Sequence, residues 1–215
     1  MKTVRIVILA KAPLPGLAKT RLVPALGENG AADLAVRMLI HSVSEAVKSG
    51  IGSIELSVSP AVEASVWHDA EIPESVKLTE QIKGDLGQRM EHIARRVISN
   101  GESILMIGTD CPQITADVLI DAALALDTHD CCIIPVSDGG YALLGLNRHL
   151  PELFSDIPWS TGDVAFLTIQ RIRQAGLSLA ELPMLHDIDV ADDLKWLPES
   201  WQQDFMQKTN GVTYE

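Results

Sequence analysis

Apolar residues follow two patterns along this chain: short runs, some of them interrupted by polar residues, and longer stretches with helical spacing. The short runs predict β-strands over residues 4–10, 54–59, 76–79, 103–108, 131–136, 141–146 and 179–182. The helical spacing predicts α-helices over residues 31–48 and 86–98. Because strands alternate with helices, we expect an α/β fold with a mostly parallel sheet and helices on both faces.

Further helices are predicted from the residues that begin them. Thr115 can cap a helix that runs to residue 126, and residues 160–163 fit a capping box for a helix to about residue 175. Trp201 and Phe205 lie at helical spacing, which predicts a terminal helix and tail over 198–215. No repeat or linker divides the 215 residues, so we expect a single domain over 1–215.

Three cations closely follow the first predicted strand. The segment LAKAPLPGLAKTRL, residues 9–22, places Lys11, Lys19 and Arg21 around a Pro/Gly turn. Cations and backbone N–H groups that converge on one loop suit a di- or triphosphate. A solvated loop is the alternative interpretation. A Walker A loop does not fit, because alanine precedes Lys19 and position 13 is proline.

Carboxylates follow two later predicted strands. Asp110 comes directly after the strand at 103–108 and can hold a hard divalent cation, or it can satisfy the amides of its own turn. Asp187 and Asp189 alternate along an extended segment, so they share one face and suit a metal ion shared with Asp110. The aspartates at 192 and 193 are expected to cap the next helix.

Two further segments are candidates for substrate contacts. Asp138 could bind a sugar hydroxyl or act as a base, and Gly139 and Gly140 after it allow a ligand to approach the backbone. A hairpin turn explains the same Asp-Gly sequence nearly as well. The Trp-Ser-Thr sequence at 159–161 could border an acceptor pocket, or the tryptophan could pack. His186 is a weaker candidate for a base.

Charge and composition exclude several classes of function. The chain has 29 acidic and 17 basic residues, a net charge of −12, which disfavours nonspecific binding to nucleic acid. The apolar run near the start is far shorter than the roughly 20 residues of a membrane span, so we expect a cytoplasmic protein. Three cysteines, two of them adjacent, form no zinc or redox motif.

Six motifs in order resemble one bacterial family nearly end to end. They are LAKAPLPGLAKTRL, GDLGQRM at 84–90, GTDCP at 108–112, SDGGYALLGL at 137–146, IPWST at 157–161 and DIDVADDL at 187–194. This set resembles the radical-SAM/selenodomain-associated transferase 1 family, often called glycosyltransferases. The resemblance implies the glycosyltransferase-A fold of nucleotide-diphospho-sugar transferases. The chain is more distantly similar to molybdenum-cofactor and 2-phospho-L-lactate guanylyltransferases.

The resemblance also implies roles for particular residues. Nucleotide binding would fall to seven residues: Ala10, Lys11, Gly16, Lys19, Arg21, Gly84 and Arg89. Asp110, Asp187 and Asp189 would hold Mg²⁺ or Mn²⁺, with Asp110 and Asp138 catalytic. Substrate contacts would come from Gly139, Gly140, Trp159, Ser160 and Thr161. The sequence departs from the usual Asp-x-Asp signature of glycosyltransferases, because the position two after Asp110 is Pro112.

Three functions are compatible with these residues. We expect first a glycosyl transfer from a nucleoside-diphosphate sugar to a small-molecule acceptor, with a metal ion and the basic loop stabilising the leaving diphosphate. The alternative is nucleotidyl transfer from a nucleoside triphosphate to a phosphorylated acceptor, which releases pyrophosphate. A nucleotide-binding module without catalysis is the third. The nucleobase, the acceptor and the oligomeric state are left open.

Overall fold

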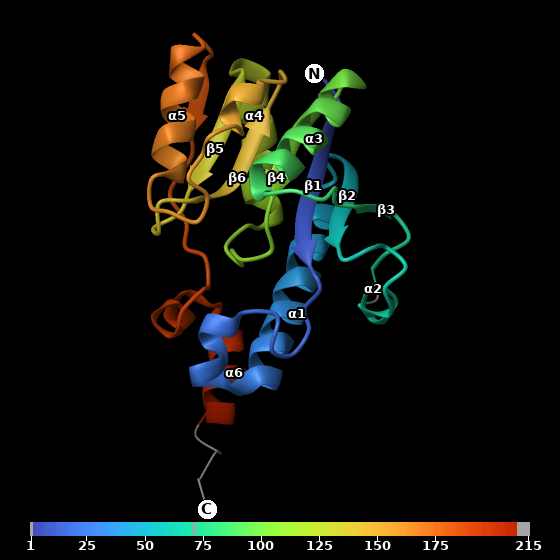
Figure 1. The fold of residues 1–215 in the computed structure, drawn as a ribbon, viewed down its shortest axis with the longest axis vertical. Coiled ribbons are helices and arrows are strands. Elements are labelled where there is room, and N and C mark those ends of the chain that lie inside the picture. The colour runs from blue at the N-terminus through green and yellow to red at the C-terminus, as the bar shows by residue number, and fades with distance from the viewer. Residues whose placement is uncertain (1, 71, 210–215) are drawn as a thin grey trace, which may run out of the picture.

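One mixed β-sheet organises the structure, a computed structural model that describes residues 2–70 and 72–209 (Figure 1). Within the described residues the sheet has seven strands in the order β3-β2-β1-β4-β6-β5-β7. The strands are β1 (Val4–Lys11), β2 (Gly52–Ser59), β3 (Val76–Glu80), β4 (Ser103–Ile107), β5 (Cys131–Pro135), β6 (Tyr141–Leu146) and β7 (Leu179–Glu181). Only β6 runs antiparallel to its neighbours β4 and β5. The expected α/β fold with a mostly parallel sheet is therefore confirmed.

Helices cover both faces of this sheet, as predicted. The α-helices of the described residues are α1 (Val23–Ser49), α2 (Ser65–Asp69), α3 (Leu86–Ser99), α4 (Ala116–Thr128), α5 (Val164–Gln174) and α6 (Glu199–Thr209). Apolar residues of α1 and α4 share one core cluster with the sheet, and those of α3 and α5 share another on the opposite face. Short 3-10 helices occupy Thr20–Leu22, Pro151–Leu153 and Ala191–Trp196.

The first helix begins earlier than its apolar spacing predicts. It starts at Val23, eight residues before the predicted start, and contains Gly27 in a non-helical conformation with φ 71° and ψ 168°. Pro24 near the helix start and the two glycines in this stretch obscure the periodicity. The strand and helix predictions elsewhere agree with the observed elements within a few residues.

Of the two predicted helix starts, one is confirmed and the other is wrong. The Thr115 hydroxyl accepts a hydrogen bond from the Val118 amide and caps α4. The predicted capping box at 160–163 does not form, because Asp163 has a backbone close to helical and makes no side-chain cap. Ser160 instead adopts a left-handed φ of 65°, which turns the chain there.

A third core cluster lies beyond the carboxyl ends of the strands. It joins the first half of α1, the helix α6 and the extended segment that precedes α6. Its buried side chains are Leu22, Ala31, Leu34, Met38, Ile188, Leu197 and Phe205. In Figure 1 these elements form the lower part of the molecule. Residues 210–215 of the predicted tail lie outside the described residues. Among the helices described, none has the length and apolar character needed to cross a bilayer.

Candidate functional site

The carboxyl ends of the central strands bring four polar segments together. Three are loops that follow β1, β4 and β5, and the fourth is the extended segment 185–190. Backbone hydrogen bonds fix this last segment, because the Ile188 amide donates to the Asp110 carbonyl at 2.9 Å and the Leu185 amide donates to the Pro135 carbonyl at 3.0 Å. The fully buried Ile188 side chain anchors the segment in the third core cluster. Its two aspartates are thereby held beside the other loops.

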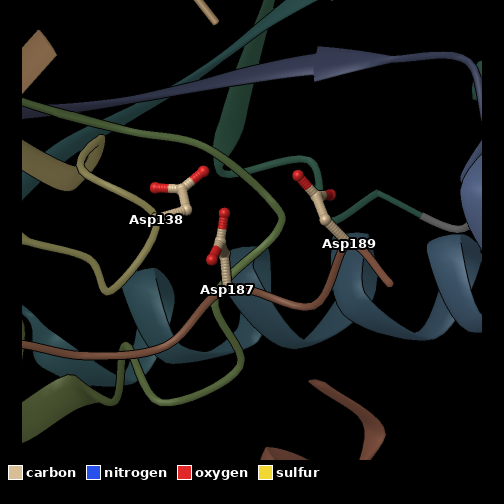
Figure 2. Close-up of side chains that lie close together, drawn as sticks. All are labelled: Asp138, Asp187 and Asp189. Atoms are coloured by element: carbon tan, nitrogen blue, oxygen red, sulfur yellow. The ribbon is translucent and has the colours of Figure 1, made fainter. Parts of the chain in front are cut away.

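Three carboxylates meet at this place. Asp138, Asp187 and Asp189 offer oxygen atoms that all lie within 4.8 Å of one another. Figure 2 shows Asp187 and Asp189 on the same side of their segment, with Asp138 approaching from the loop between β5 and β6. Asp138 is exposed and the other two are half-buried. Carboxylate oxygens are the ligands that Mg²⁺ and Mn²⁺ prefer, so the donor set fits such an ion.

The electrostatics of the cluster agree with that fit. Burial, together with the neighbouring charges of Asp138 and Asp189, raises the pKa of Asp187 to about 6. Three carboxylates this close repel one another, and a cation between them relieves the repulsion.

Lys19 lies beside this cluster and contacts the fourth carboxylate. Its ammonium is 2.6 Å from Asp110 and 2.8 Å from Asp189, and its side chain is only 9% exposed. Burial alone would lower the pKa of Lys19, but the attraction of Asp110 and Asp189 outweighs it and the pKa is raised. The structure thus joins Asp110 to the metal candidates through a lysine rather than directly.

The other cations of the basic loop remain open to solvent. Lys11 and Arg21 are exposed, and neither makes an ion pair within residues 2–70 and 72–209. Gly16 turns the loop with a φ of 72°. Two cations are therefore available to phosphate oxygens at the end of β1.

A glutamine that sequence analysis did not single out connects the other predicted nucleotide residues. The Gln81 amide nitrogen donates to the carbonyls of Ala10 and Ser57, at 3.2 and 2.7 Å, while its oxygen accepts from Arg89 at 3.3 Å. Arg89 also donates to the Gly84 carbonyl at 2.9 Å. Gln81 follows β3 directly, so its place at the carboxyl end of a strand was a signal that could have identified it.

The predicted substrate loops pack against each other. Gly139 has φ 91°, and a Cβ atom there would lie 2.0 Å from the Gly162 carbonyl oxygen. The Asp138 carboxylate accepts the Gly140 amide at 2.8 Å, which forms the turn that the alternative interpretation expected. The Asp138 carboxylate therefore takes part both in this turn and in the three-carboxylate cluster.

The remaining candidates take more structural positions. Trp159 is half-buried and lies against Gly87 at the start of α3, while Ser160 and Thr161 are exposed, with the Thr161 hydroxyl donating to the Pro158 carbonyl. His186 stacks on Trp196 with ring centroids 3.7 Å apart, and its Nδ1 contacts the Ser137 hydroxyl at 3.0 Å. These contacts place His186 at the edge of the site.

The fold is shared with solved structures. A protein from Desulfovibrio desulfuricans G20, described as a "putative nucleotide-diphospho-sugar transferase", superposes with a TM-score of 0.88 over 100% of both chains, at 24% identity. A cytidylyltransferase from Leptospira borgpetersenii gives 0.61 over 100% of both chains, at 14% identity. Rv0371c from Mycobacterium tuberculosis H37Rv, solved in complex with manganese, gives 0.55 at 17% identity, over 90% of this chain and 96% of that one.

The sequence comparisons define the family. A search of curated proteins finds no match. Residues 42–161 match the family described as "Uncharacterized protein conserved in bacteria", DUF2064, and this match includes Asp110, Asp138 and Arg89. Since the match covers more than half of the chain, the protein belongs to the DUF2064 family.

Proposed function

We propose that the protein is a metal-dependent transferase that uses a nucleotide-activated donor, and that it transfers a glycosyl group from a nucleoside-diphosphate sugar to a small acceptor. The observation that carries this proposal is the meeting of three carboxylates within 4.8 Å beside a basic loop, at the carboxyl end of the sheet. Ligands of open α/β sheets bind at this end. The fold shared with the Desulfovibrio desulfuricans protein supports the same assignment.

Each group of residues has its own role in the proposed reaction. Asp187 and Asp189 hold Mg²⁺ or Mn²⁺, which when bound neutralises the charge that develops on a departing diphosphate. Lys11 and Arg21 bind the phosphate oxygens from the other side. Arg89, fixed by Gln81, lines the nucleotide pocket.

Asp138 is assigned as the base. It is the exposed member of the cluster, so an acceptor hydroxyl can reach it from solvent. Its carboxylate takes the hydroxyl proton as the acceptor oxygen bonds to the sugar carbon, while the bond from that carbon to the diphosphate breaks. Replacing Asp138 by asparagine is expected to abolish turnover and preserve Mn²⁺ affinity. A loss of Mn²⁺ affinity would instead make Asp138 a ligand.

Nucleotidyl transfer is a second candidate, favoured by a specific observation. Asp110 is followed by Cys111 and Pro112 rather than by a second aspartate two positions on. The fold is also shared with a cytidylyltransferase. In that reaction a phosphorylated acceptor attacks the α-phosphate of a nucleoside triphosphate, and pyrophosphate leaves. We also propose that the protein belongs to the radical-SAM/selenodomain-associated transferase 1 family, which the six motifs resemble.

The test is a thermal-stability screen against nucleoside triphosphates, diphosphates and diphosphate sugars, each with Mn²⁺, with Mg²⁺ or with EDTA. A ligand at about 100 times its dissociation constant adds about 2.7 kcal/mol of stability, or roughly 5–10 °C for a chain of this size. Metal-dependent stabilisation by one diphosphate sugar above its triphosphate supports glycosyl transfer. Preference for a triphosphate, with pyrophosphate released on turnover, supports nucleotidyl transfer.

Matched variants make the screen specific. Replacing Asp189 by asparagine is expected to remove the metal-dependent part of the shift. Replacing Asp121, an exposed aspartate of α4, removes the same charge away from the site and should leave the shift unchanged. No shift with any compound contradicts the proposed donor, and binding without turnover over a broad acceptor panel indicates a module without catalysis.

A further inference from the structure

Lys19 links Asp110 to the three-carboxylate cluster. Its ammonium bridges Asp110 Oδ1 and Asp189 Oδ1, at 2.6 and 2.8 Å. The same Asp189 belongs to the three-carboxylate cluster. Asp110 and Asp189 are therefore bridged by an internal cation.

The backbone conformation of Lys19 directs its side chain toward Asp110 and Asp189. Lys19 has φ 47° and ψ 43°, a left-handed conformation that is uncommon for residues other than glycine. The Leu22 amide donates to the Lys19 carbonyl at 2.8 Å and begins the 3-10 helix, whose Leu22 side chain is fully buried. Strained conformations of this kind persist where the surroundings enforce them, often at functional sites. The ammonium is buried as a result, while Lys11 and Arg21 of the same loop are exposed.

We propose that Lys19 is an exchangeable counter-ion, which leaves Asp110 and Asp189 when Mg²⁺ or Mn²⁺ binds and then binds the phosphates of the donor. This inference rests on the metal-dependent transferase function proposed above. Lys19 thereby makes the binding of the metal ion and the binding of the donor phosphates depend on each other, in addition to contacting the phosphates.

Elementary electrostatics supports the exchange. A divalent ion held by Asp187 and Asp189 would compete with the Lys19 ammonium for Asp189, and its double charge would repel the ammonium. The released lysine has a flexible four-carbon stem and three N–H donors, which suit phosphate oxygens. Competition with Lys19 weakens metal binding in the absence of phosphate. By linkage, a phosphate that captures Lys19 strengthens metal binding, and the metal strengthens phosphate binding equally.

The first measurement is the affinity for Mn²⁺ alone, followed through the electron paramagnetic resonance signal of free Mn²⁺. Replacing Lys19 by methionine removes the internal cation, so this variant is expected to bind Mn²⁺ roughly tenfold more tightly than the wild type. Replacing Lys19 by arginine keeps the charge and should keep the weaker affinity. Replacing Lys77, an exposed lysine of β3, by methionine is the matched control and should change nothing.

The second measurement follows Lys19 itself in the wild type. Acetylation by an N-hydroxysuccinimide ester is read by mass spectrometry for each lysine, with and without Mn²⁺. Buried Lys19 should react slowly in EDTA and several-fold faster with Mn²⁺, whereas Lys77 should react equally in both. Neither measurement requires nucleotide or turnover.

The outcomes separate this inference from the proposed function. Equal Mn²⁺ affinity of the wild type and the methionine variant, or Lys19 labelling that Mn²⁺ leaves unchanged, overturns the exchange. An absence of Mn²⁺ binding to both proteins overturns it too. The transferase proposal is judged independently, by the nucleotide screen on the wild type. Circular dichroism and the melting temperature show whether each variant is folded.

Discussion

At the residue scale, Asp187 makes stability depend on pH. Its pKa is raised to about 6 in the folded protein from an ordinary value of 3.8, because of burial and of Asp138 and Asp189. A folded state that binds the proton more tightly than the unfolded state loses stability as pH rises between these two values. Above about pH 6, the ionised carboxylate therefore destabilises the fold.

We expect the Asp187→Asn variant to be more stable than the wild type at pH 7.5 in EDTA. The gain should be about 1 kcal/mol after allowance for solvent screening, or roughly 2–4 °C in melting temperature. At pH 4 the advantage should shrink, because the wild-type carboxyl then holds its proton. Melting curves at both pH values test this, and a variant less stable than the wild type at pH 7.5 would contradict it.

Gly139 provides a second prediction for a single residue. A methyl group there would meet the Gly162 carbonyl oxygen at 2.0 Å, and the left-handed φ of 91° adds strain. Gly101→Ala is a matched control, because Gly101 has φ 81° but nothing within 4 Å of the added atom. We expect Gly101→Ala to cost about 1 kcal/mol and Gly139→Ala about 2–4 kcal/mol in urea unfolding, with donor binding weakened only in the second. Equal losses would show that the contact with Gly162 is unimportant.

The sequence predicts where the site residues lie better than it predicts what they contact. Asp110 and Asp138 follow apolar strands, so their place at one edge of the sheet was predictable. The pairing of Lys19 with Asp110 and Asp189 was not predictable, because it depends on a left-handed backbone conformation at a lysine. It also joins residues far apart in the sequence, since Lys19 and Asp189 are separated by 170 positions. Gln81 was missed because its three partners come from separate elements.

At the scale of elements, a buried ion network joins α3 to the sheet. Glu55 of β2 is fully buried and contacts Arg96 of α3, Arg5 of β1 and Thr79 of β3. Burial would raise the pKa of Glu55, but hydrogen bonds from Arg96 and Thr79 and the charges of Arg96 and Arg5 outweigh it, so the pKa is lowered. This network holds the last turn of α3 against the sheet, at the opposite end of the helix from Arg89.

Replacing Glu55 by glutamine should destabilise the protein by about 3–5 kcal/mol at pH 7, because two arginines are left without their buried partner. The wild type should lose this contribution progressively as pH falls from about 4.5, the ordinary pKa of a glutamate, through the lower pKa of Glu55 in the folded protein. Glu181→Gln, which breaks an exposed pair with Arg173, should cost under about 1 kcal/mol. Urea unfolding at pH 7 and pH 4 measures both, and similar losses for the two variants would rule out the structural role of the network.

Element order was predictable, but the direction of one strand was not. Continuous apolar runs mark strands such as β4 and β5, because strands that are buried on both faces need them. The same pattern does not distinguish β6, which follows β5 through the tight turn at 137–140 and so runs antiparallel. The hairpin alternative for Asp138-Gly139 contained that information. Reading the turn as a hairpin would have predicted both the strand direction and the position of Asp138 beside β5.

At the scale of the whole molecule, the site lies between the sheet and the third core cluster. Ile188 is part of that cluster, and its neighbours in sequence are the candidate metal ligands Asp187 and Asp189. Phe205 of α6 packs in the same cluster. The helix α6 and the acidic segment are therefore anchored in the same core cluster.

This arrangement predicts that a substitution in α6 acts on metal binding. Phe205→Ala should cost about 3–5 kcal/mol of stability. Leu126→Ala, at a buried residue of α4 in another core cluster, should cost about 2–5 kcal/mol. Both variants should remain folded at low temperature. There, Mn²⁺ affinity should fall several-fold in Phe205→Ala, because the core cluster that anchors Ile188 is loosened and the aspartates become less fixed. It should stay at the wild-type value in Leu126→Ala. Equal Mn²⁺ affinity of the two variants would mean that the acidic segment is held by its backbone hydrogen bonds to Asp110 and Pro135 alone.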